Sequence, residues 1–274
     1  MLLSRVNVRR GEVVVRATRT LAALDEVGSG DHVLQLLDPA DDVWDRSRAF
    51  LSDGELFGDK VLIVGPVSRT TAAFAPVVLD PARLNGSLIS AVRREAASAE
   101  REGYRSLRVL HHVTCDRSAV DAEQLLRSEL ELEEFAADSG ALVVCAYQRG
   151  EENAPAPEQA TCVHPQHLGG RPTSPAFQVY RTGKDGWTVT GVIDADGAPA
   201  FGAVLRTLLC EVVTVRLLCH GLDFLDAAGM SSLADAARCL PDRKVVLEGT
   251  NETVRLAWEL TGFADPSIPV VMTP

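Results

Sequence analysis

Long apolar runs are missing from this sequence of 274 residues. No stretch approaches the roughly 20 apolar residues that a membrane-crossing helix needs, and the first residues lack the apolar segment of a signal peptide. A basic excess is missing too, because the formal net charge is −11, which disfavours nonspecific binding to nucleic acid. We therefore expect a cytoplasmic protein that binds neither membranes nor nucleic acid.

Aromatic side chains and closely paired cysteines are also scarce. Aromatic residues make up 5% of the chain and hydrophobic residues 46%, so the core is expected to consist mainly of Val, Leu and Ala. In a reducing compartment, separated cysteines are expected to remain free thiols that pack as small hydrophobic side chains. The six cysteines are Cys115, Cys145, Cys162, Cys210, Cys219 and Cys239.

The sequence also lacks the motifs of common enzymes. It contains no Gly-x-Ser-x-Gly elbow and no cysteine in a recognised nucleophile motif, and we interpret the acidic run at 129–134 as a solvated helix face. Residues 65–71 follow a predicted strand but lack the second glycine and the lysine of a phosphate-binding loop, and Pro66 removes one backbone N–H. We therefore expect neither an enzyme nor a protein with a bound cofactor.

Apolar patterns in the first half of the chain predict an α/β domain. Short apolar segments alternate with segments of helical periodicity, which indicates a mostly parallel sheet with helices on both faces. The predicted strands cover residues 33–37, 60–64, 107–113 and 141–147, and the predicted helices cover residues 43–57, 84–102 and 121–137.

The second half predicts a mixed sheet covered by helices. A turn at 183–186 joins two strands into a hairpin, and Asn251 and Gly262 are suited to cap the last helix. The predicted strands are 177–181, 187–193, 212–218, 244–248 and 269–272, and the predicted helices are 201–209, 230–240 and 252–261. Chain length fits two domains, and the turn-rich stretches 150–157 and 169–175 place their boundary near residue 176.

The order of these elements and the segments 191–194 and 223–229 resemble a STAS domain, the fold of bacterial anti-sigma-factor antagonists. The resemblance implies such a domain at 177–274. In antagonists switched by a kinase, this loop carries a serine that the partner anti-sigma factor, a histidine-kinase-like ATPase, phosphorylates. Asp226 and Gly229 match the loop, whereas Ala227 and Ala228 stand at the serine positions.

Alanine has no hydroxyl group to phosphorylate, and three interpretations remain open. The loop docks permanently, or Ser231 or Ser232 replaces the acceptor, or the domain has lost kinase control and serves dimerisation or signal transmission. The two serines are alternatively interpreted as satisfying N–H groups of the first helical turn, and Asp226 as a helix cap. The predicted partner-binding loop consists of Asp226, Ala227, Ala228, Gly229, Met230, Ser231 and Ser232.

The first half resembles a MEDS domain, a bacterial sensory module. The residues that carry this resemblance are Gly30-Asp31-His32-Val33, Cys145-Ala146-Tyr147, and His164-Pro165 followed by Gly169-Gly170 and Pro175. It implies a fold similar to the RecA and KaiC ATPases without their ATPase motif, and a small organic ligand. We assign residues 28–176 to this domain and residues 1–27 to an N-terminal extension.

Four histidines are candidates for a ligand pocket: His32, His111, His112 and His164. His32 opens a predicted strand, and the ends of strands often line the ligand crevices of α/β domains. His111 and His112 are adjacent on a strand and point to opposite faces. Cys162, His164 and His167 are of zinc-binding types, but they lack a fourth partner in sequence, so we expect no metal.

Together the two resemblances predict a signalling regulator with a ligand-sensing first domain and an output domain of the anti-sigma-factor antagonist type. Its expected partner is an anti-sigma factor of the histidine-kinase-like ATPase type. The alternative is an interaction or dimerisation scaffold coupled to the sensor, in which the protein forms a homodimer and no sigma pathway is involved.

Overall fold

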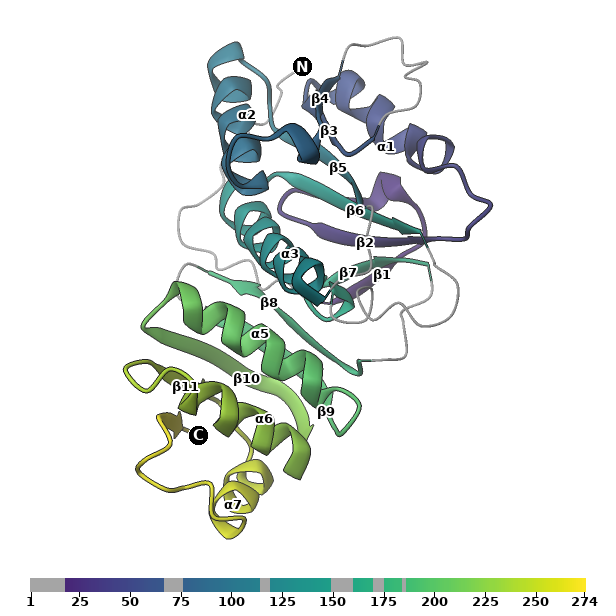
Figure 1. Ribbon diagram of the computed structural model, residues 1–274. Helices are drawn as coiled ribbons and strands as arrows, with labels where there is room; N and C mark the ends of the chain where they lie inside the picture. Colours follow the sequence, from purple (N-terminus) through teal and green to yellow (C-terminus); the bar gives the residue numbers. More distant parts are fainter. Residues whose placement is uncertain (1–17, 67–75, 114–118, 149–159, 170–174, 184–185) are drawn as a thin grey trace, which may run out of the picture.

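The structure, a computed structural model, describes residues 18–66, 76–113, 119–148, 160–169, 175–183 and 186–274. These residues form two β-sheets, each covered by helices, with helix α3 (Ala119–Ser139) between them (Figure 1). The α/β class that the sequence predicts is confirmed. None of the helices in the described part is long and apolar enough to cross a membrane.

The first sheet contains seven strands, all parallel, in the order β1-β7-β2-β6-β5-β3-β4. Its strands are β1 (Arg19–Leu21), β2 (His32–Leu37), β3 (Lys60–Val64), β4 (Val77–Leu79), β5 (Leu107–Val113), β6 (Leu142–Gln148) and β7 (Gln166–Leu168). The first of these lies inside the segment assigned to an N-terminal extension, and it pairs with β7.

Helices cover both faces of this sheet because its side chains alternate between the faces. On one face, α1 (Val43–Phe57) contributes Phe50 to a cluster with Val33 and Val144. On the other face, α2 (Leu88–Glu102) and α3 pack on the neighbouring strand positions, among them Val143. Single 3₁₀ turns lie at Leu24–Glu26 and Pro81–Arg83. Strands that carry apolar residues at successive positions are thus buried on both sides.

The second sheet has five strands in the order β12-β11-β10-β9-β8. The two strands that come first in the sequence, β8 and β9, form the predicted antiparallel hairpin, and all other pairs are parallel. The elements are β8 (Phe177–Thr182), β9 (Gly186–Ile193), α5 (Ala198–Glu211), β10 (Thr214–Leu225), α6 (Ala227–Arg238), β11 (Lys244–Glu248), α7 (Glu252–Leu260) and β12 (Val270–Met272). As predicted, Asn251 caps α7 by accepting a hydrogen bond from the Val254 amide, and Gly262 follows the helix with a φ of 82°.

One boundary differs clearly from the expectation. Strand β10 continues to Leu225, seven residues past its predicted end at Leu218, with two register shifts against β9 that let it curve onward. Helix α6 then begins at Ala227 instead of Met230, because Asp226 caps it. The predicted loop is therefore reduced to one residue between a strand and a helix.

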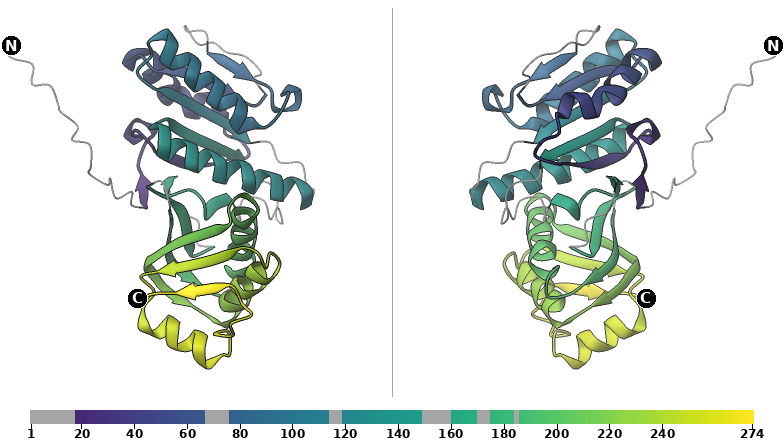
Figure 2. Two further views of the ribbon diagram at one scale, coloured as in Figure 1. Left: turned by 90° about the vertical axis from the view of Figure 1, so that its left-hand side faces the viewer. Right: turned by 90° about the vertical axis from the view of Figure 1, so that its right-hand side faces the viewer.

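The two sheets share a hydrophobic core through α3. Leu126 and Leu130 of this helix, together with Cys162 and Val163, belong to the same cluster of buried residues as Phe201 of α5. The helix contacts both β8 and α5, and the side views show it lying between the first sheet and the second half of the chain (Figure 2). Residues 150–157, one of the two predicted linker stretches, lie outside the described residues.

Candidate functional site

A cluster of buried polar side chains lies beneath α3, on the face of the first sheet that this helix covers. His32 is at the start of β2, Cys145 in the middle of β6, Glu129 on α3, and His164 just before β7. All four have no measurable solvent exposure. His111, at the end of β5, joins them and is also buried. We call these five residues the buried cluster.

Strand register explains why these residues meet. Cys145 pairs with Leu34 on β2 and with His111 on β5, so residues at these positions and two positions away share one face. His32 is two residues before Leu34 and therefore points to the same side. On α3, Glu129 and Glu133 are one turn apart and face the sheet together. The cluster thus follows from parallel pairing and two regular periodicities.

Glu129 is the centre of the buried cluster. Its Oε2 atom lies 3.1 Å from Nε2 of His32, 3.2 Å from Sγ of Cys145 and 3.2 Å from Nε2 of His164. Its Oε1 atom accepts a hydrogen bond of 2.5 Å from the Tyr147 hydroxyl. One carboxylate oxygen therefore faces two imidazoles and a thiol.

The opposite nitrogen of each imidazole faces an oxygen outside the cluster. Nδ1 of His164 donates to the Ala160 carbonyl at 2.7 Å, and Nδ1 of His32 lies 3.4 Å from Oε2 of Glu133. The centroids of the two rings are 4.0 Å apart. Both rings are therefore held with Nε2 directed inward.

Burial and close contact shift the ionisation of these groups. Burial lowers the pKa of His164 and of His111, whereas the close carboxylates of Glu129 and Glu133 outweigh burial and raise the pKa of His32. Burial would raise the pKa of Glu129, but the adjacent imidazoles of His164 and His32 hold it well below its ordinary value. Burial and the neighbouring carboxylate raise the pKa of the Cys145 thiol well above its ordinary value.

Three of the four predicted pocket histidines, His32, His111 and His164, meet in the buried cluster. The fourth, His112, lies on the opposite face of the sheet, where its ring meets Trp44 edge-on at a centroid distance of 6.4 Å. Adjacent strand residues point to opposite faces, so His111 and His112 do not share a pocket. Their separation follows the alternation that the sequence predicts.

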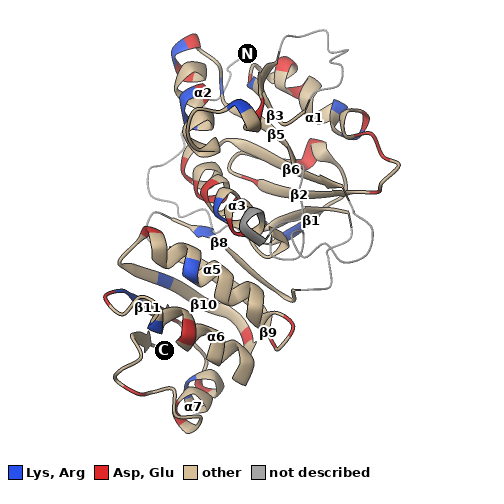
Figure 3. Cartoon of the chain, viewed as in Figure 1, with Lys and Arg blue, Asp and Glu red and all other residues tan. Residues whose placement is uncertain are grey.

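The acidic run at 129–134 is not a solvated face, and that interpretation was wrong. Glu129 and Glu133 are fully buried, while Glu131 and Glu134 are half-buried; Figure 3 marks the acidic positions along α3. The spacing of four residues between these two carboxylates places both on one helix face and could have indicated their shared burial. Likewise, Cys145 and Tyr147 are two residues apart on one strand, a spacing that places both on one face of the sheet.

The predicted zinc-type triplet of Cys162, His164 and His167 does not converge. Cys162 packs in the hydrophobic core shared with the second sheet, where burial raises its pKa to about 12. Nε2 of His167 accepts a hydrogen bond of 2.6 Å from the Gln178 side chain. Only His164 of this triplet faces the buried cluster.

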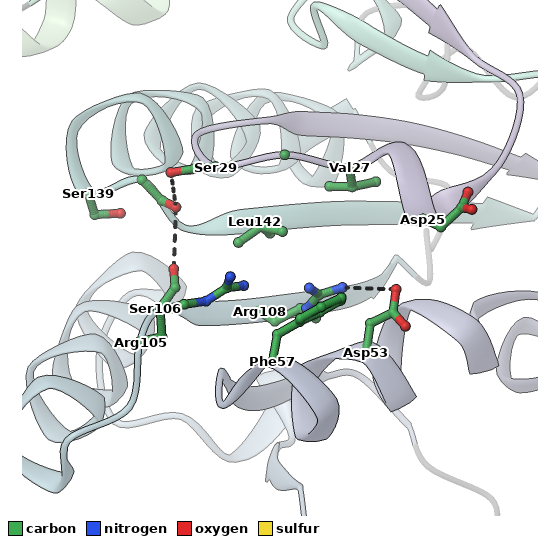
Figure 4. A pocket seen from close by; sticks show the side chains of 12 residues that line it. Asp25, Val27, Ser29, Asp53, Phe57, Arg105, Ser106, Arg108, Ser139 and Leu142 are labelled. Atoms are coloured by element: carbon green, nitrogen blue, oxygen red, sulfur yellow. Dashed lines mark hydrogen bonds and ion pairs between the residues drawn. The ribbon is translucent and has the colours of Figure 1, made fainter. Parts of the chain in front are cut away.

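A separate pocket of about 430 Å³ lies at the amino-terminal edge of the first sheet (Figure 4). Arg105 and Arg108 line it, but Asp59 pairs with both guanidinium groups, at 2.9 and 3.0 Å, and Asp53 lies 4.0 Å from Arg108. Its arginines are therefore neutralised in place. The buried cluster, which brings imidazoles, a thiol and a carboxylate within 4.8 Å of one another, is therefore the stronger candidate for a functional site. In the segment 65–71, which lacks the pattern of a phosphate-binding loop, residues 67–71 lie outside the described residues.

In the second half, the predicted partner-binding loop forms the start of α6. Oδ1 of Asp226 accepts a hydrogen bond from the Gly229 amide at 2.8 Å, so this residue caps the helix. Gly229 and Met230 are buried, and a Cβ atom on Gly229 would lie 2.5 Å from Cδ1 of Leu225. Gly229 and Met230 therefore position the helix and offer no free surface, and Asp226 is half-buried.

The exposed part of this region consists of Asp223, Phe224 and Ala227, which we call the α6 surface. Phe224 is 47% exposed, which is unusual for a large apolar side chain. Ser231 and Ser232 are half-buried in the second turn of the helix, beyond the free amides of the first turn. Neither serine therefore caps the first turn.

The first half of the chain matches a known family. Residues 31–165 match the model of the MEDS family, described as the MEthanogen/methylotroph, DcmR Sensory domain. This range contains every residue of the buried cluster. A MEDS sensory domain in the first half, expected from the sequence, is thereby supported.

Among solved structures, one described as "Structure of the Anti-Sigma Factor Antagonist SpoIIAA in its Unphosphorylated Form" is similar to part of the chain. The two share 18% sequence identity over 36% of this chain and 88% of the other, with a TM-score of 0.28. A TM-score this low supports no inference about function or partners. No curated protein matches the chain.

Proposed function

We propose that this protein is a signalling regulator in which the first domain senses a small ligand and the second domain binds a protein partner. The match of residues 31–165 to a family of sensory domains carries the proposal. The buried cluster lies within that range and gathers polar groups at a place where burial is costly unless they are paired or bound. It is therefore the proposed sensing site.

Two polar connections run from the buried cluster to β8, the edge strand of the second sheet. Glu133 lies beside Nδ1 of His32, and its Oε1 atom accepts a hydrogen bond of 2.9 Å from the Arg181 amide. The carbonyl of His164 accepts a hydrogen bond of 2.8 Å from the Gln178 side chain. A ligand that moves either histidine therefore acts on β8, and this strand is the element that couples the two domains.

The proposed output is the α6 surface, and the proposed partner is an anti-sigma factor of the histidine-kinase-like ATPase type. Support comes from the sequence Asp226-Ala227-Ala228-Gly229, which resembles the loop of anti-sigma-factor antagonists. Because Ala227 adds no charge and cannot be phosphorylated, the surface resembles the unphosphorylated form. Control of docking then passes from phosphorylation to the ligand of the first domain.

The test is binding of the full chain to candidate anti-sigma factors, with Ala227→Glu as the diagnostic variant. An acidic residue in the first turn is favourable to the helix, so this change adds charge to the docking surface without loss of folding. Thr253→Glu places the same charge on an exposed position in the first turn of α7 and is the matched control. We expect the first variant to weaken binding at least about 100-fold, because a charge buried in an interface without a partner of opposite sign is costly. We expect the control to bind as the wild type does.

Equal binding by both variants would contradict docking at the α6 surface. Absence of any binding by the wild-type chain would contradict the anti-sigma partner. In that event the oligomeric state, measured by light scattering, decides the scaffold alternative: a dimer that Ala227→Glu dissociates indicates that the same surface serves self-association.

A further inference from the structure

We propose that the buried cluster binds a divalent transition-metal ion, zinc in the first place. The ligands are Nε2 of His32, Oε2 of Glu129, Sγ of Cys145 and Nε2 of His164. These donor atoms all lie within 4.8 Å of one another, and the four side chains are fully buried. The inference deepens the proposed function, on which it rests for the role of this site, by naming the class of ligand. Ion binding itself requires no partner protein.

The first argument is the orientation of His164. A carbonyl oxygen only accepts hydrogen bonds, so Nδ1 of His164 carries the proton that it donates to Ala160. In the neutral ring, Nε2 then presents a lone pair. Among the described residues this buried atom has no hydrogen-bond partner, although Oε2 of Glu129 lies only 3.2 Å away. Two lone pairs that face each other repel, and a cation between them turns that repulsion into coordination.

The second argument is the environment of the two imidazoles. A histidine that ligates a metal usually donates its other ring N–H to a carbonyl or a carboxylate, which fixes the ring and its tautomer. His164 has this arrangement with the Ala160 carbonyl. Nδ1 of His32 forms no hydrogen bond among the described residues, but it lies 3.4 Å from Oε2 of Glu133, so that a carboxylate faces this ring from behind as well. Both rings are therefore oriented from behind, as ligands are.

The third argument is geometric and chemical. Zinc–nitrogen bonds of about 2.0–2.1 Å in a tetrahedron place neighbouring donors about 3.4 Å apart. Oε2 of Glu129 lies 3.1 to 3.2 Å from the other three donors, and Nε2 of His32 lies 3.3 Å from Sγ of Cys145. Two imidazoles, a thiolate and a carboxylate are typical zinc ligands, and the thiolate disfavours magnesium and calcium.

The size of the site also favours an ion over an organic molecule. Four of the donor–donor distances are 3.1 to 3.3 Å, all donors lie within 4.8 Å of one another, and none of their side chains reaches solvent, so the space between them suits a single ion. Binding replaces the S–H bond of Cys145 with a sulfur–metal bond, and the released proton passes to solvent.

The experiment uses the full chain, freed of metal with a chelator and then titrated with Zn²⁺ and with Co²⁺. We expect one ion per chain, and for Co²⁺ an absorption band from thiolate-to-metal charge transfer. Cys145→Ser removes that band, and both Cys145→Ser and His164→Gln weaken zinc binding by more than about 100-fold, beyond the loss that outer partners cause. Cys162→Ser and His167→Gln are matched controls that keep the band and the affinity. Circular dichroism of each variant verifies its folding.

Two results would overturn the proposal. One is a wild-type chain that binds neither ion, a result that needs no variant to fold. The other is a cobalt band that survives in Cys145→Ser or disappears in Cys162→Ser. Neither result bears on whether the α6 surface binds a protein partner.

Discussion

Glu129 and Glu133 are carboxylates without solvent exposure on adjacent turns of α3. Burying a charged carboxylate is costly unless close partners compensate it. Glu129 has two imidazoles, a thiol and the Tyr147 hydroxyl around it, and Glu133 accepts the Arg181 amide. Their burial is therefore compensated by residues that come from both halves of the chain.

Glu133 is expected to tune the metal site without touching the ion. Replacing it with glutamine removes the negative charge behind His32 and keeps the size of the side chain. Because outer partners of ligating histidines contribute to affinity, we expect Glu133→Gln to weaken zinc binding about 10- to 100-fold. Competition titration with a chromophoric chelator measures the change. Glu131→Gln, at a half-buried position on the same helix, is the control, and equal losses in both variants would refute the role of Glu133.

At this scale the sequence identified His32, His111 and His164 but missed the acidic residues. Carboxylates on a solvated helix face and on a buried one have the same spacing, because the sequence does not state how many faces of the helix are covered. Helix α3 has apolar residues toward both sheets, Leu132 toward the first and Leu130 toward the second. With two covered faces, Glu129 and Glu133 are enclosed as well.

Strand β8 is the element at which the two domains meet. Its Val179 amide donates to the Cys162 carbonyl at 2.6 Å, and its Gln178 side chain reaches His164 and His167. The edge of the second sheet is thereby covered by residues of the first domain, as exposed strand edges commonly are.

Removing the Gln178 amide leaves two buried acceptors without this donor. We expect Gln178→Leu to lower the free energy of unfolding by about 1–3 kcal/mol, the cost of unsatisfied buried polar groups. Urea denaturation measures it. Gln148→Leu removes an exposed glutamine whose amide donates to the Pro39 carbonyl, and it is expected to change stability by less than about 0.5 kcal/mol. A cost for Gln178→Leu no larger than for this control would show that the connection is not stabilising.

Most helices and long strands were predictable because their periodicities extend over many residues. Strands β1, β4 and β7 have three residues each, too few to show a period of two, and none was foreseen. The end of β10 was missed for another reason. Its register shifts interrupt the alternation, so the last residues of the strand resembled a loop.

On the scale of the whole molecule, the two halves share one hydrophobic cluster. Leu126 and Leu130 from the first half belong to it together with residues of the second sheet and its helices. From the sequence we expected two domains, each with a core of its own, joined by a turn-rich linker. Sequence patterns do not reveal which apolar helix face packs on a neighbouring domain, and the boundary near residue 176 stays a prediction.

Because this cluster spans both halves, we expect them to unfold together. Leu130→Ala removes a buried side chain of α3, at a cost of about 2–5 kcal/mol, and should lower the unfolding midpoints of both halves. Trp44 reports on the first half, and Trp187 and Trp258 report on the second, in variants that keep only one set of tryptophans. Coincident transitions indicate a single cooperative unit. Leu56→Ala, at a position 75% exposed, is the control, and a shift confined to one half would contradict the coupling.

Synthesis of the chain on the ribosome gives the placement of α3 a further consequence. This helix emerges before β8 and α5, whose residues cover Leu126 and Leu130. At about 5–20 residues per second, the nascent first domain displays an uncovered apolar stripe for several seconds. During that interval it is a natural client for chaperones, and premature termination after the first domain should yield an aggregation-prone fragment.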